Sequence, residues 1–62
     1  MEFARERELV HLRYELRRLM ADRRRDEASP LLERLRQIAA DQTWEVPALR
    51  PEIERWASTF GL

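Results

Sequence analysis

The chain has 62 residues, no cysteine and a formal net charge of zero, from twelve basic and twelve acidic residues. A core this small stabilises a fold weakly, and without cysteine neither a disulfide nor a thiolate metal site can reinforce it. No run of about 18 apolar residues could span a membrane, and the charged start lacks the apolar segment of a secretory signal. We therefore expect one small, soluble, cytoplasmic domain covering residues 1–62.

A long helix is predicted for residues 2–25, because opposite charges recur three or four positions apart and neither proline nor glycine interrupts them. At about 100° per residue this helix carries two apolar stripes on nearly opposite sides. The first stripe consists of Leu9, Leu12, Leu16, Leu19 and Met20. The second consists of Phe3, Val10, Tyr14 and Ala21. A helix that only covers its own core needs one apolar face, so the second stripe predicts contact with another protein chain.

A second, shorter helix is predicted for residues 30–42, with Ser29 as its N-cap and Pro30 at its first position. The short link between the two helices predicts an antiparallel hairpin. Residues 43–50 are expected to form a connector. A short third helix is then predicted for residues 51–60, with Gly61 as its left-handed cap. The sequence leaves open whether this third helix packs on its own hairpin or on a partner.

These elements predict an all-α fold, an antiparallel helical hairpin with a short C-terminal third helix. Residues 1–25 hold eight arginines and five acids, a net charge of +3, and residues 26–62 hold four arginines and seven acids, a net charge of −3. This charge asymmetry and the second apolar stripe both favour assembly of two copies into a dimeric helical bundle. The residues expected at the interface are Phe3, Val10, Tyr14, Arg17 and Ala21.

Groups that could perform catalysis are scarce. His11 is the single histidine and lies on the polar side of the predicted first helix. A nucleophilic mechanism needs a hydroxyl or thiol beside a base, and Ser29 already has a predicted capping role. The single glycine excludes a glycine-rich phosphate loop. We therefore predict no enzymatic activity, catalytic residue, metal, cofactor or small-molecule substrate.

The sequence supports two functions. The first is a non-enzymatic protein–protein interaction module, such as an accessory subunit, adaptor or regulator, whose partner is a second copy or a different protein. The alternative is a small dimeric nucleic-acid-binding regulator, because all twelve basic residues are arginine and many of them lie in the predicted first helix. The candidate phosphate contacts are Arg13, Arg17, Arg18, Arg24 and Arg25. The same arginines could instead form salt bridges beside an apolar seam.

Overall fold

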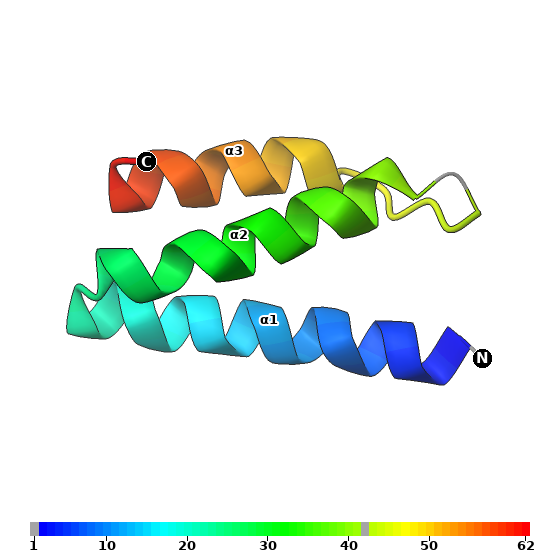
Figure 1. Cartoon of the computed structure of the whole chain (residues 1–62), viewed down its shortest axis with the longest axis horizontal. Helices are drawn as coiled ribbons and strands as arrows, with labels where there is room; N and C mark the ends of the chain where they lie inside the picture. Colours follow the sequence, from blue (N-terminus) through cyan, green and yellow to red (C-terminus); the bar gives the residue numbers. More distant parts are fainter. Residues whose placement is uncertain (1, 42) are drawn as a thin grey trace.

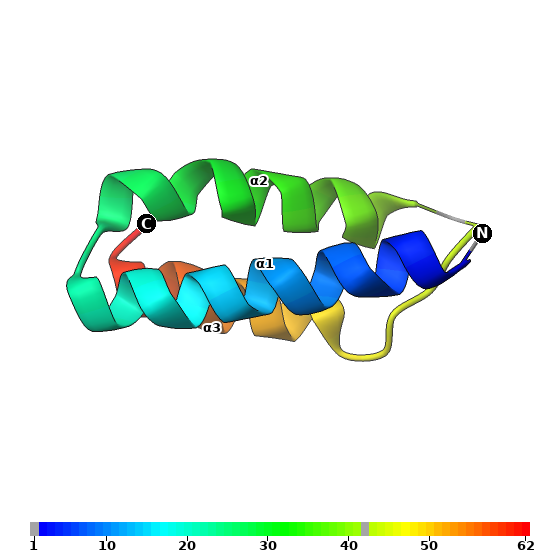
Figure 2. The same cartoon turned by 90° about the horizontal axis from the view of Figure 1, so that it is seen from below.

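Over the residues that it describes, the computed structural model contains three helices: α1 (Glu2–Asp22), α2 (Arg25–Ala40) and α3 (Leu49–Phe60). It describes the backbone of residues 2–41 and 43–62, and the side chains of residues 4–41 and 43–62. Helices α1 and α2 form an antiparallel hairpin, and α3 runs back along both of them (Figures 1 and 2). Each pair of helices is in contact. The all-α class and the packing of α3 on its own hairpin are thus established, whereas assembly into a dimer stays a prediction.

The turn between α1 and α2 lies earlier in the chain than the sequence predicts. Helix α1 ends at Asp22, before the predicted residue 25, because Arg23 adopts the left-handed conformation with a φ of 56°. The Arg23 N–H donates to the carbonyl of Met20 at 3.2 Å, and the Arg24 N–H donates to the carbonyl of Leu19 at 2.9 Å. These two bonds form a Schellman cap, which satisfies the last carbonyls of the helix. The end of α1 is therefore set by backbone hydrogen bonds at an arginine.

Helix α2 begins at Arg25, so the prediction of Ser29 as its N-cap is wrong. The earlier start places Asp26 and Glu27 in the first turn, where their charges interact favourably with the helix dipole. It also buries Ala28 completely against the other helices. Pro30 lies inside the helix and lacks an N–H, which removes one hydrogen bond near the N-terminal end. Helix α2 therefore begins five residues before Pro30, and this earlier start places Ala28 in the core.

The far end of the hairpin also differs in detail from the prediction. Helix α2 ends at Ala40, a connector covers residues 41–48, and α3 begins at Leu49, directly after Ala48 with a φ of 61°. The end of α3 at Phe60 agrees with the prediction. Gly61 has a φ of 73°, and its N–H donates to the carbonyl of Ser58 at 3.1 Å. The left-handed cap at Gly61 is therefore confirmed.

The core is shared equally among the three helices, each of which contributes four buried residues in the described part of the chain. These are Leu9, Leu12, Leu16 and Leu19 of α1, Ala28, Leu32, Leu35 and Ile38 of α2, and Leu49, Ile53, Ala57 and Phe60 of α3. Met20, predicted to belong to the first stripe of α1, is 43% exposed because it lies at the edge of that stripe. In the described part of the chain, no helix is both long and apolar enough to cross a membrane. The core closes within one chain without the second stripe of α1.

Candidate protein-interaction face

A strip of α1 points away from the core, and we call it the outer face. It consists of Arg7, Val10, Tyr14, Arg17 and Ala21, all of which are exposed. Val10 is 65% exposed and Tyr14 is 62% exposed, although both side chains are large and apolar. Spacings of three and four residues place the five side chains along one line of the helix. Phe3, the remaining residue of the predicted interface, has a side chain outside the described residues.

The outer face has a shallow depression in its N-terminal half. Arg7, Val10 and Tyr14 line a shallow depression of about 530 Å³ together with Glu6 and His11. Arg7 was not among the predicted interface residues, although its position three residues before Val10 could have revealed it. The depression therefore has an apolar floor from Val10 and Tyr14 and charged side chains at its edge.

A bidentate ion pair joins one flank of α1 to α3. Arg13 donates from Nε to Glu52 Oε2 at 2.9 Å and from Nη2 to Glu52 Oε1 at 2.6 Å. The indole N–H of Trp56 donates to the same carboxylate at 3.2 Å. The hydrogen bonds from Arg13 lower the pKa of Glu52 below its ordinary value, and Trp56 adds to this shift. This pairing holds Glu52 as a carboxylate and orients α1 relative to α3.

A second bidentate pair joins the opposite flank of α1 to α2. Arg34 donates from Nε to Glu8 Oε2 at 2.6 Å and from Nη2 to Glu8 Oε1 at 2.8 Å. These hydrogen bonds lower the pKa of Glu8 below its ordinary value. With both flanks joined to neighbouring helices, α1 is held so that Val10 and Tyr14 face solvent. Neither pair could be predicted directly from the sequence, because the partners lie 26 and 39 positions apart.

The connector is held to the start of α1 by Arg5. Its guanidinium lies 2.9 Å from Asp41 Oδ2, donates to the Thr43 hydroxyl at 3.3 Å, and lies 5.9 Å from the ring centroid of Trp44. The hydroxyl and the N–H of Thr43 donate to Asp41 and lower the pKa of that carboxyl. This cluster positions the connector and lies away from the outer face.

The arginines predicted to contact nucleic acid do not form one surface. Arg13 pairs with Glu52, Arg18 pairs with Glu15 at 2.9 Å, and Arg24 pairs with Glu27 at 3.4 Å. Among the residues that the structure describes, no ion pair engages the other two candidates, Arg17 and Arg25. Three of the five charges are thus compensated within the chain, which weakens their attraction for phosphate. Contact with nucleic acid stays a prediction.

Arg13 and Arg17 do lie together, in a hollow of about 450 Å³ between α1 and α3. Arg55 of α3 lines the same hollow, a neighbour that the sequence could not reveal because it depends on how the two helices pack. Arg18 follows Arg17 by about 100° of helical rotation and so faces another side of α1.

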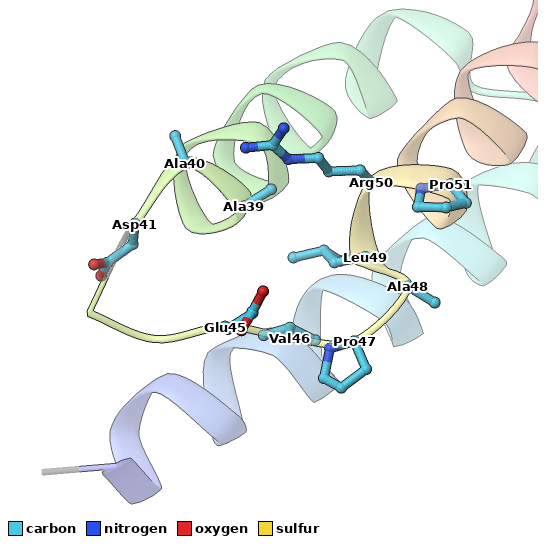
Figure 3. A pocket seen from close by; sticks show the side chains of 10 residues that line it. All are labelled: Ala39, Ala40, Asp41, Glu45, Val46, Pro47, Ala48, Leu49, Arg50 and Pro51. Carbon is cyan, nitrogen blue, oxygen red and sulfur yellow. The ribbon is translucent and has the colours of Figure 1, made fainter.

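A larger hollow, of about 930 Å³, lies where the connector curves between the end of α2 and the start of α3 (Figure 3). Leu49 extends into the space that the loop encloses, whereas Asp41 points away from it (Figure 3). The charged residues in its lining are Asp41, Glu45 and Arg50. The other residues that line it are alanine, valine, leucine and proline (Figure 3).

Comparisons with protein-family models, with curated proteins and with solved structures give no significant match. The functional assignment therefore depends on the geometry and chemistry of the chain's own residues.

Proposed function

We propose that this protein is a non-enzymatic protein–protein interaction module whose docking surface is the outer face of α1. The observation that carries the proposal is the exposure of Val10 and Tyr14, at 65% and 62%, beside a core that is complete without them. Tyrosine is enriched among the residues that dominate binding energy at interfaces. Burying the exposed parts of two such side chains would contribute on the order of 2–4 kcal/mol.

The attachment of α1 to both neighbouring helices supports the same proposal. The Arg13–Glu52 and Glu8–Arg34 pairs join it to α3 and α2, so the outer face is presented on a fixed scaffold. A preorganised surface loses less conformational entropy when it binds. A small adaptor or accessory subunit would act in this way, with a second copy or a different protein on the outer face. The lack of cysteine suits work in a reducing compartment such as the cytoplasm.

Site-specific cross-linking in cells that normally produce the protein tests this proposal. A photoreactive phenylalanine analogue replaces Val10 or Tyr14 in one set of variants, and Glu33 or Glu54, exposed on α2 and α3, in the control set. Because all four positions are exposed, the core and the melting temperature should stay unchanged. We expect discrete cross-linked species from positions 10 and 14 alone. Equal cross-linking from the control positions, or no adduct from positions 10 and 14, would refute the proposal.

A further inference from the structure

We propose that the partner at the outer face is an acidic amphipathic helix of another protein and not a second copy of this chain. The inference rests on the proposed function and deepens it. It comes from the two arginines, Arg7 and Arg17, that lie in line with Val10 and Tyr14 on the outer face.

The outer face has the spacing of a helix-pairing seam. Its residues fall at positions 7, 10, 14, 17 and 21, which alternate steps of three and four as the central positions of a coiled coil do. Along the seam, Val10 and Tyr14 lie between Arg7 on the N-terminal side and Arg17 on the C-terminal side. A helix that aligned with α1 along this seam would meet an arginine, two apolar side chains and a second arginine in turn.

Neither arginine has an acidic partner within the described part of the chain. Two nearby acids pair with other arginines: Glu15 of α1 with Arg18, and Glu52 of α3 with Arg13. Glu6 lines the same depression as Arg7 and makes no ion pair with it within 4.0 Å. Both guanidinium groups are therefore available to a carboxylate from outside.

Pairing of two copies along this seam brings like charges together. In an antiparallel pair centred between Val10 and Tyr14, each Arg7 lies opposite Arg17 of the other copy. In a parallel pair in register, each arginine lies opposite its own counterpart. Opposed like charges at seam positions disfavour a pairing. Shifting the register by one heptad avoids this clash but shortens the contact along α1, which limits the buried area.

A partner helix with acidic residues would place opposite charges, instead of like charges, beside Arg7 and Arg17. Its carboxylates would lie ten positions apart, opposite Arg7 and Arg17, with apolar residues three and seven positions after the first carboxylate. The spacing reads the same in both chain directions, so it fits a parallel or an antiparallel partner. Arginine pairs with carboxylates through two parallel hydrogen bonds, a geometry that Arg13 and Arg34 already adopt within this chain.

The protein itself supplies the probe for the test. The double variant R7E/R17E keeps Val10 and Tyr14 and carries glutamates at the required spacing. Sedimentation velocity would compare wild type alone, R7E/R17E alone, and an equimolar mixture. We expect both proteins alone to be monomeric and the mixture to form a one-to-one complex, with a dissociation constant at least tenfold below either self-association. Tyr14→Ser in the wild-type partner should abolish this complex.

The matched control is R25E/R50E, which has the same net charge but places both glutamates off the outer face. Arg25 and Arg50 are exposed and, like Arg7 and Arg17, have no ion pair among the described residues, so all variants should keep the wild-type helix content and melting temperature. The inference is overturned if R25E/R50E binds wild type as tightly, or if wild type self-associates as tightly as the mixture. Cross-linking from Val10 to a second copy would overturn it too, while retaining the proposed function.

Discussion

A variant with glycine at position 23 should be more stable than a variant with alanine there. Arg23 ends α1 with a φ of 56°, in the position of a Schellman cap where glycine is usual. The same chain contains a direct comparison, since Gly61 ends α3 with a φ of 73° and makes the equivalent pair of backbone hydrogen bonds. One cap therefore has a side chain that strains the left-handed backbone, and the other does not.

The expected difference between the two variants follows from opposing contributions to the free energy of unfolding. The left-handed conformation costs a residue with a Cβ roughly 1–2 kcal/mol. Glycine avoids this cost, but it also makes the unfolded chain more flexible, which lowers the free energy of unfolding by about 0.4–1 kcal/mol. Arg23→Gly also removes a cation from a helix C-terminus, where its interaction with the helix dipole is worth about 0.3–1 kcal/mol. Arg23→Ala removes the same cation, so Arg23→Gly should exceed Arg23→Ala by about 1 kcal/mol.

Thermal unfolding followed by circular dichroism measures this difference. One kcal/mol corresponds to a melting-temperature shift of about 4–8 °C in a domain of this size. Gly61→Ala provides the reciprocal test with the opposite sign, because a Cβ at Gly61 would meet no atom within 4 Å and the cost is purely conformational. Equal melting temperatures for Arg23→Gly and Arg23→Ala would refute the reasoning and show that the left-handed turn at Arg23 is not a source of strain.

Three further predictions concern the core, the ion pairs and the outer face. Leu16→Ala should destabilise the fold by about 2.7–5 kcal/mol and leave little native protein at 25 °C, because Leu16 is completely buried; Met20→Ala, at a 43% exposed position, is the control for circular dichroism. The pKa of Glu52 is lowered in the folded state, so its contribution to stability is full above the ordinary pKa near 4.5 and is lost as pH falls through the lower, folded value. Glu52→Gln should therefore flatten the fall in melting temperature between pH 7 and pH 3, and an unchanged slope would contradict this. Val10→Asp should weaken partner binding tenfold or more while shifting the melting temperature by only a few degrees; unfolding of this variant would show that Val10 belongs to the core.

The helical periodicity of the sequence predicted the core well. Leu9, Leu12, Leu16 and Leu19 face α2 and α3 as expected, because apolar residues at steps of three and four must lie on one side of a helix. The turn at Arg23 was not predicted, since glycine and proline are the usual sequence signals for helix ends and neither is present there. Ser29 and Pro30 gave a plausible but wrong start for α2, because burial of Ala28 and the capping bonds at Arg23 and Arg24 compete with local capping preference.

The candidate interaction face was visible in the sequence only in part. Val10 and Tyr14 could be recognised because they lie opposite the core stripe, where a helix that packs only within its own hairpin needs no apolar residues. Only the structure shows that Arg7 and Arg17 have no ion pair among the described residues, since any of the arginines of α1 could have paired with acids on α2 or α3. Arg13, which the sequence grouped with Arg17, proved to be joined to Glu52 of α3.

The sequence by itself determined the helical class, the hairpin, the core stripe and the second apolar stripe, because each of these depends on the spacing of residues along one chain. The tertiary structure decided where α1 ends, that α3 packs on its own hairpin, and which arginines are compensated. These depend on contacts between residues far apart in the chain, and their energies compete with local preferences of similar size. The exposure of Val10 and Tyr14 belongs to the second group, since a side chain is left on the surface only when no other helix covers it.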